Sequence, residues 1–156
     1  MRRLTAQLAM VALLLLTSCG PEAIINESHE IPNGEWVFEN GVQFSAEIVD
    51  TLQPVNYYIQ VRHSGNYAYR NLIVYFKTFY PNNTYMVDTI NCPLAEPSGK
   101  WLGSGLGDML DNRILFKINQ RFPMSGGYNF EIQHAMRPDI IHEVYDVGLL
   151  IEKAKN

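Results

Sequence analysis

Cysteine is scarce in this chain of 156 residues, which contains only Cys19 and Cys92. A domain of this size without a set of disulfides must be stabilised by its hydrophobic core. Hydrophobic residues make up 47% of the sequence, which is enough for such a core. Cys92 lies before Pro93 at the end of an apolar run, which favours a small buried side chain near a strand end. A reactive thiol or an intermolecular disulfide at Cys92 is the alternative.

Positive charge is also limited, with 12 Lys and Arg against 16 Asp and Glu. Arg2 and Arg3 lie in a segment that we expect to be removed, and the remaining 10 positive and 16 negative residues give the mature chain a net charge of −6. A mildly acidic protein is a poor candidate for binding nucleic acid or for an electrostatic grip on anionic lipid.

Motifs for metal binding, nucleotide binding and catalysis are missing. No two histidines have the i, i+2 or i, i+4 spacing that places two metal ligands on one local face, and His134 falls on an apolar strand face, as a core histidine would. The glycine-rich segment 99–108 has Lys100 before Gly103, Gly105 and Gly107, and no helix is expected to follow them, so it does not match a phosphate-binding loop. Ser104 lacks the GxSxG pattern of a hydrolase nucleophile. We therefore expect no catalytic activity, no cofactor and no nucleotide ligand.

The N-terminus has the features of an export signal. Arg2 and Arg3 precede an apolar run that is densest over residues 8–16, and small residues follow it. This order describes a secretory signal, and the run is shorter than the roughly 20 apolar residues of a membrane-spanning helix. Residues 1–18 are therefore predicted to be a cleaved signal peptide.

The end of that signal, Leu16-Thr17-Ser18-Cys19, matches the lipobox of bacterial lipoproteins. In such proteins the cysteine sulfur receives a diacylglyceryl group, and cleavage before the cysteine leaves it as the new N-terminus. Two or three acyl chains hold a protein on a membrane, whereas one chain binds only marginally. We predict lipid attachment at Cys19; an ordinary secreted protein with a chance cysteine at this position is the alternative.

Most of the chain is punctuated by short turns at regular intervals. Strand-like segments between the turns alternate apolar and polar residues or carry β-branched and aromatic runs. The expected strands span 35–39, 42–50, 55–63, 71–80, 84–92, 113–122, 128–136 and 143–154. About eight strands without a long helix predict one all-β domain, an antiparallel sandwich or barrel-like fold over residues 35–156.

Two segments lack a strand pattern. Residues 19–34 show no sustained period, and we interpret them as a lipidated N-terminus followed by a flexible tether. Residues 95–112 contain four glycines and one proline, and a single short helical turn around Asp108–Asn112 would fit there. Trp101, Gly103 and Gly105 in this irregular segment, together with Tyr145, are our candidates for a surface that binds a partner or a ligand. Core or edge packing is the alternative for each of them.

The mature sequence resembles the gliding motility lipoprotein GldH family of Bacteroidota from about Trp36 to Glu152. The segment before Asp146 departs from it, with Glu143-Val144 where members often have Gly-Ile. The residues that carry the resemblance are Tyr58, Val61, Arg62, His63, Tyr67, Tyr69, Asn71, Leu72, Gly103, Gly105, Gly127, Tyr128, Phe130, Gln133, Met136, Arg137, Asp146-Val147-Gly148 and Ile151-Glu152, with Cys19 at the lipobox.

The resemblance implies a cell-envelope lipoprotein without known enzymatic activity, needed for gliding in motile relatives and tied there to type IX secretion. Exported proteins of this phylum are often O-glycosylated at Asp-Ser/Thr-apolar triplets, which makes Thr51 and Thr89 candidate modification sites. The lack of an acidic cluster after Cys19 favours the periplasmic face of the outer membrane.

Two functions follow from these features. The first is a non-enzymatic lipoprotein that binds other envelope proteins of a motility or secretion assembly. The second is a lipoprotein whose β-domain holds a small ligand or a glycan, using the glycine-rich loop and nearby aromatic residues. An envelope hydrolase would need a nucleophile and a base that the sequence does not offer.

Overall fold

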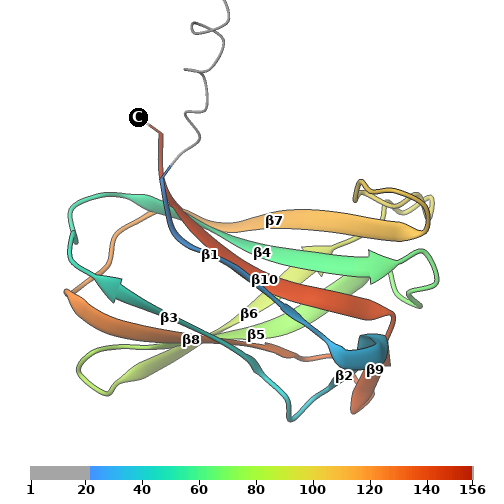
Figure 1. The fold of residues 1–156 in the computed structure, drawn as a ribbon, viewed down its shortest axis with the longest axis horizontal. Coiled ribbons are helices and arrows are strands. Elements are labelled where there is room, and N and C mark those ends of the chain that lie inside the picture. The colour runs from blue at the N-terminus through green and yellow to red at the C-terminus, as the bar shows by residue number, and fades with distance from the viewer. Residues whose placement is uncertain (1–21, 156) are drawn as a thin grey trace, which may run out of the picture.

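The computed structural model describes residues 22–155, which form a sandwich of two four-stranded antiparallel sheets (Figure 1). One sheet has the order β1-β10-β4-β7 and the other the order β3-β8-β5-β6, and β2 pairs with β9 at one end. The elements are β1 (Ala23–Glu30), the 3₁₀ turn η1 (Pro32–Gly34), β2 (Glu35–Val37), β3 (Val42–Ile48), β4 (Val55–Ser64), β5 (Asn71–Phe79), β6 (Tyr85–Pro93), β7 (Met109–Gln120), β8 (Gly126–His134), β9 (Ile140–His142) and β10 (Val144–Lys153). The expected all-β antiparallel architecture is confirmed.

Alternation of side chains explains why the central strands form. Successive residues of a strand point to opposite faces, so a strand with one buried face reads apolar at every second position. In β8 the residues Tyr128, Phe130, Ile132 and His134 are buried and face the core, as the pattern predicts. In β4 the inward residues from Val55 to His63 alternate with more exposed ones in the same way.

Aromatic rings fill the middle of the sandwich. Phe76 lies edge-to-face with Phe116 and stacks against Phe130, with centroid separations of 4.9 and 5.8 Å. Tyr57 and Tyr128 extend this cluster along the core. Each such pair contributes about 0.5–1.5 kcal/mol beyond the area it buries, so the aromatic content of the sequence stabilises the packing of one sheet on the other.

The sandwich is elongated, with one end at each extreme of its long axis (Figure 1). The described chain starts and stops near one of them, where Lys153 donates its backbone N–H to the Glu22 carbonyl and Ala154 donates to the Pro54 carbonyl. We call this the termini end. The other end, which we call the Trp101 end, holds the 94–108 loop, the β4–β5 turn, η1 and the β2–β9 pair. Strand β4 runs between the two ends, and its ten residues cover about 33 Å at 3.3 Å per residue.

The flexible tether expected over residues 19–34 is wrong from Ala23 onward. Residues Ala23–Glu30 form β1, which pairs with β10 in antiparallel register, from Ala23 opposite Glu152 to Glu30 opposite Asp146. The sequence conceals this strand because β1 lies at a sheet edge and only Ile25, 3% exposed, is fully buried. An edge strand with a single core residue has no apolar period to detect.

The structure differs from expectation along β7 as well. The helical turn expected near Asp108 is wrong, because β7 begins at Met109 and Asp111 exchanges backbone hydrogen bonds with Ser104. Within this strand Ile114 and Phe116 pack against the core, whereas Ile118 is 57% exposed. The pairing of β7 with β4 shifts register near Tyr57, and such a shift turns the following side chains to the other face.

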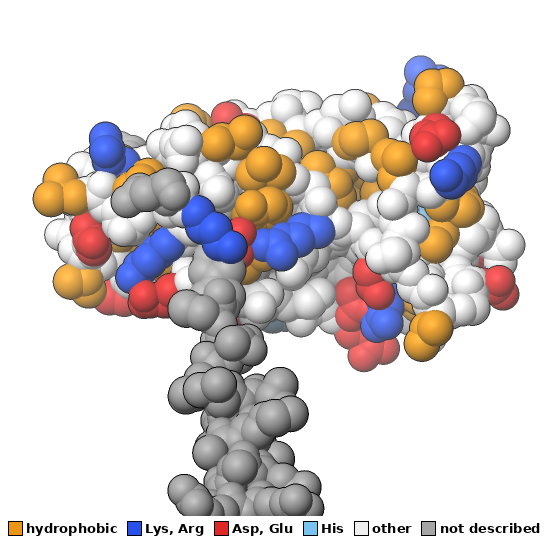
Figure 2. All heavy atoms as spheres, turned by 90° about the horizontal axis from the view of Figure 1, so that it is seen from above, with side chains coloured by type: hydrophobic (Ala, Val, Ile, Leu, Met, Phe, Trp, Pro, Cys, Tyr) orange, Lys and Arg blue, Asp and Glu red, His pale blue; other side chains and the backbone are white. Residues whose placement is uncertain are grey.

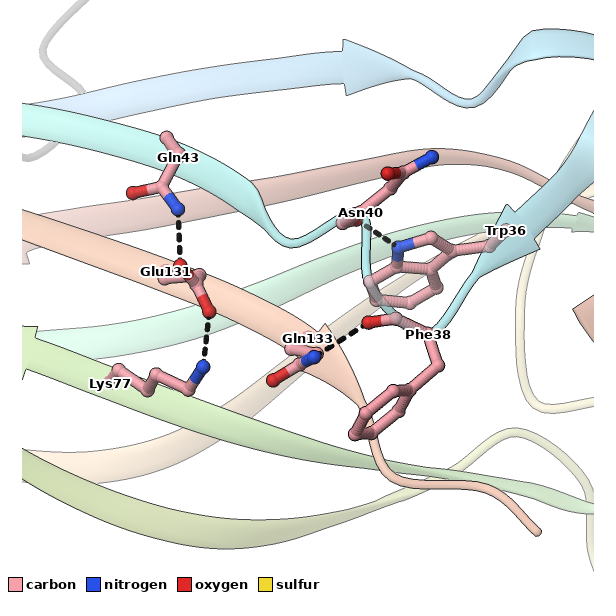
Figure 3. A network of polar contacts seen from close by, with 7 residues as sticks. All are labelled: Trp36, Phe38, Asn40, Gln43, Lys77, Glu131 and Gln133. Atoms are coloured by element: carbon pink, nitrogen blue, oxygen red, sulfur yellow. Dashed lines mark hydrogen bonds and ion pairs between the residues drawn. The ribbon is translucent and has the colours of Figure 1, made fainter. Parts of the chain in front are cut away.

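A polar network holds the β2–β3 connection onto the second sheet (Figure 3). Gln133 donates its amide N–H to the Phe38 carbonyl at 2.6 Å, and the Trp36 indole N–H donates to the Asn40 carbonyl at 2.8 Å. Glu131 accepts from Gln43 and pairs with Lys77 on the outer face of that sheet. These bonds hold the β2–β3 connection against β8.

Among the described residues there is no helix long and apolar enough to cross a membrane.

Candidate functional site

The four surface candidates from the sequence all lie at the Trp101 end. Trp101, Gly103 and Gly105 belong to the 94–108 loop, and Tyr145 lies at the start of β10 beside the end of β4. The structure therefore places at one end residues that are 40 to 44 positions apart in the chain. Trp101, Gly103 and Tyr145 are half-buried, and Gly105 is exposed.

The loop carrying Trp101 is fixed by backbone hydrogen bonds. Trp101 forms a β-bridge with Ala95, and the Leu102 N–H donates to the Leu94 carbonyl at 2.8 Å. The Gly65 N–H donates to the Asp108 carbonyl, which joins the loop to the β4–β5 turn. The Trp101 ring packs on the buried ring of His63, with centroids 4.7 Å apart. Trp101 therefore has a packing role, which is the alternative to partner binding given above for this residue.

The two glycines of this loop allow it to fold tightly against β7. A Cβ atom on Gly105 would lie 1.9 Å from the Met109 carbonyl oxygen, a separation that no side chain tolerates. At Gly103 the same atom would lie 2.7 Å from the amide nitrogen of Asn112. Close approach to the Met109 backbone accounts for Gly105, and close approach to the Asn112 side chain accounts for Gly103.

Leu102 and Leu106 are exposed on this loop but were not among the candidates predicted from the sequence. Their exposed fractions are 52% and 94%, and both project from the same pinned loop. Most exposed leucines need no explanation, but two on one short loop are candidates for apolar contact with a partner. Their only sequence signal is that they are leucines in a loop with four glycines and two serines.

Tyr145 completes this end of the molecule on the β10 side. Its ring covers Gly34 of η1, where φ is +68° and a Cβ atom would lie 2.9 Å from Tyr145 Cζ. Its backbone carbonyl accepts a hydrogen bond from Ile31 at 2.7 Å. Its hydroxyl lies 3.4 Å from Glu143 Oε2, the same oxygen that accepts from the Ser64 hydroxyl. Tyr145 therefore has a packing role and leaves one edge exposed.

His63, Ser64 and Glu143 meet at this end but are not arranged for nucleophilic catalysis. His63 Nδ1 lies 2.8 Å from the backbone carbonyl of Ser64, which only accepts, so Nδ1 carries the proton. The Ser64 hydroxyl donates to Glu143 and makes no bond to the imidazole. Burial lowers the pKa of His63, and the hydrogen bond to Ser64 opposes this shift in part. A nucleophile and its base need a direct hydrogen bond, which this group lacks.

A hollow of about 490 Å³ lies beside the loop, on the outer face of the β1-β10-β4-β7 sheet. Arg62 crosses it, with its guanidinium 3.2 Å from Asp111 and 3.7 Å from Asp146. Ser104 of the glycine-rich loop and Gln60 of β4 also line it. The hollow is open and polar, and its charges are largely paired within the protein.

The remaining sequence candidates lie elsewhere. Cys19 is outside the described residues. Thr89 is exposed on the edge strand β6, and Thr51 is half-buried in the β3–β4 loop. Cys92 is fully buried, and burial raises the pKa of its thiol to about 12. Within residues 22–155 no group of three His, Cys, Asp or Glu side chains is placed to hold a metal ion.

One family model and two relatives match most of this chain. The family model described as GldH lipoprotein matches residues 23–151. A gliding motility lipoprotein GldH homolog of Christiangramia forsetii is 32% identical over 151 residues, covering 92% of each chain. The gliding motility lipoprotein GldH of Flavobacterium johnsoniae is 25% identical over 160 residues, covering 98% of this chain and 99% of the relative.

Among solved structures the likenesses are weak. A family GH115 4-O-methyl-α-glucuronidase matches with a TM-score of 0.38 and 11% identity, over 88% of this chain and 16% of the enzyme. The VP2 subviral particle of infectious bursal disease virus matches with a TM-score of 0.30 and 14% identity, over 81% of this chain and 32% of that protein. Neither likeness carries a functional argument. The family match spans β1 to β10 and the relatives match over nearly their whole length, so this chain belongs to the GldH lipoprotein family.

Proposed function

We propose that this protein is a non-enzymatic component of a cell-envelope assembly for gliding motility, linked to type IX secretion. In this proposal it is anchored to the outer membrane through lipid on Cys19, faces the periplasm, and binds other envelope proteins through its Trp101 end. The names of its relatives support the link to gliding. The observation that carries the binding role is that the first described residues and the exposed leucine loop lie at opposite ends of the sandwich.

Anchoring is tested by replacing Cys19 with Ala in the native host. The variant is expected to move from the detergent phase to the aqueous phase after phase separation, because it loses all its acyl chains. Retention in the detergent phase would overturn lipid attachment. Protease treatment of intact cells tests the periplasmic orientation, which predicts that the protein is cut only after the outer membrane is permeabilised.

Partner binding is tested by purifying tagged protein in mild detergent. Stable stoichiometric partners are expected with the parent chain and should be lost or weakened about tenfold in Leu102→Ser/Leu106→Ser, since a few exposed anchors carry most binding energy. Val49→Ser is the matched control, because Val49 is 85% exposed but lies at the termini end, beyond β3. Equal loss in both variants, or no partner with the parent chain, would contradict the proposal.

A second candidate function, binding of a small ligand or glycan, is favoured by the hollow beside Ser104 and Arg62. The same purification distinguishes the two. A monomer that carries a co-purified small molecule, detected by mass spectrometry, would support the ligand-binding function and leave the assembly function without support.

O-glycosylation at Thr51 and Thr89 remains a proposal. Thr89 is open to a transferase on its edge strand, and Thr51 is partly covered by its own loop. Intact-mass measurement of protein from the native host, with Thr51→Ala and Thr89→Ala variants, tests each site. A mass accounted for by the polypeptide and its lipid alone would reject both.

A further inference from the structure

The first described residues leave little freedom between the sandwich and the proposed lipid. Glu22 is held by the Lys153 backbone N–H and by an ion pair with the Lys153 side chain, and β1 starts at Ala23. Only three residue steps separate Cys19 from Glu22, and a fully extended chain covers at most about 3.3–3.6 Å per residue. The acyl chains on Cys19 would therefore start within about 11 Å of Glu22.

That distance is close to the depth of a lipid headgroup layer. The bilayer measures about 40–45 Å with headgroups and about 30 Å without them, which leaves about 5–8 Å per side. A domain tied this closely cannot stand clear of the surface. Whichever face surrounds Glu22 must lie against the headgroups.

The face around Glu22 carries a cluster of cations. Arg113, Lys153 and Lys155 line a shallow hollow of about 460 Å³ together with Tyr58, Asn56 and Glu152. Arg121 lies next to this region, since its guanidinium donates to the Leu52 carbonyl at 2.8 Å in the β3–β4 loop. Figure 2 shows Lys and Arg side chains gathered around the position where the described chain begins.

Exposed apolar side chains accompany these cations. Leu52 is 80% exposed in the β3–β4 loop, two residues before Pro54, whose carbonyl accepts from Ala154. Ile118 is 57% exposed on β7, next to Asn119, whose N–H donates to Asn56 in the hollow. Figure 2 shows hydrophobic side chains on the same face as the cations. A mixed basic and apolar surface suits the boundary between headgroups and acyl chains.

Charge is divided unevenly over the domain. At the termini end Arg113, Arg121, Lys153 and Lys155 are offset by Glu22, Glu152 and Asp50 of the β3–β4 loop, a net charge of +1. The other 6 positive and 13 negative residues of the mature chain carry a net charge of −7. In residues 22–155 no carboxylate lies within ion-pairing distance of Lys155 or Arg121. A membrane with anionic phospholipid would attract the termini end and repel the rest.

We propose that this surface, formed by Arg113, Arg121, Lys153, Lys155, Leu52 and Ile118, binds the anionic phospholipid surface that holds the lipid anchor. The inference rests on the proposed lipid attachment at Cys19. It revises the expectation, drawn from net charge alone, that the protein has no electrostatic grip on anionic lipid. Docking in this way gives the sandwich a fixed orientation on the membrane surface.

The test uses the mature lipidated protein, purified in detergent and reconstituted into vesicles of phosphatidylethanolamine and phosphatidylglycerol. A fluorophore on Ile118→Cys or on Leu106→Cys reports the distance to quencher-labelled headgroups, while buried Cys92 stays unlabelled. Quenching is expected to be at least about threefold stronger at position 118, and to fall in 1 M salt, where the Debye length is about 3 Å. Equal quenching at the two positions would overturn docking.

Charge variants separate docking from anchoring. The triple variant Arg121→Gln/Lys153→Gln/Lys155→Gln should reduce quenching at position 118. The control variant Arg70→Gln/Lys100→Gln/Arg137→Gln makes the same change in net charge toward the Trp101 end. The control should leave quenching at position 118 unchanged. Both triple variants should stay on the vesicles, because the acyl chains remain. If the parent protein does not float with vesicles at all, lipid anchoring has failed; if it floats but the two triple variants behave alike, only the docking surface is wrong.

Discussion

Two fully buried histidines, His63 and His134, place titratable groups inside the sandwich. His134 packs edge-to-face against Trp36 and Phe38, with ring centroids 5.4 and 5.7 Å away. Neither of its ring nitrogens has a hydrogen bond of good geometry in residues 22–155, although backbone groups of Asp139 and Trp36 lie near enough to favour its charged form. Burial is the larger effect and lowers the pKa of His134, as it does for His63.

These lowered pKa values predict a protein that is less stable in mild acid. The unfolded chain takes up protons on histidine near its ordinary pKa of about 6.5, while the folded state resists until lower pH. The free energy of unfolding should therefore be steady above about pH 7 and should fall as pH drops through about 6.5 toward the lowered folded values. Urea unfolding at several pH values measures this dependence.

The variant His134→Phe should flatten part of that slope, since it keeps an aromatic ring against Trp36 and Phe38 and removes the titrating group. His142→Phe is the control, because His142 is an exposed side chain on β9. A slope that is unchanged in His134→Phe would show that the acid sensitivity arises elsewhere.

At the scale of elements, what the sequence could predict depended on how many core residues each strand has. Strands such as β4 and β8 bury every second residue and were found within one or two positions of their true bounds. Strand β1 buries only Ile25, and β9 is three residues long, so neither has a readable period. The packing of Trp101 on His63 joins residues 38 positions apart and depends on register, which no local pattern contains.

Strand β1 is expected to contribute to stability, which a tether would not. Ile25→Ala should lower the free energy of unfolding by about 2–4 kcal/mol, because it removes buried methyl groups and leaves a cavity against the core. Glu27→Ala, an exposed position in the same strand, should change it by less than about 0.5 kcal/mol. Thermal or urea unfolding checks both variants. Similar stability of the two would mean that residues 23–30 do not belong to the folded sheet in solution.

At the scale of the whole molecule, the sandwich separates the termini end, for which we propose membrane contact, from the Trp101 end, for which we propose partner binding. Paired strands in both sheets extend from one end toward the other, and β4 alone covers about 33 Å. A closely tied, rigid domain of this length would hold Leu102 and Leu106 at a set height above the bilayer. The function proposed for the Trp101 end then depends on where the chain is attached as well as on the surface itself.

A spacer inserted after Pro21 separates these two requirements. Twelve Gly and Ser residues would add a root-mean-square reach of about 20 Å, so the domain could leave the headgroups and tumble. We expect unchanged thermal unfolding and unchanged membrane retention, but loss of selective quenching at Ile118 and a clear reduction in partner co-purification. The same spacer appended after Asn156 is the control and should alter none of these. If partner binding survives the internal spacer while quenching is lost, the Trp101 end binds its partner at any height, and close attachment serves only the membrane contact.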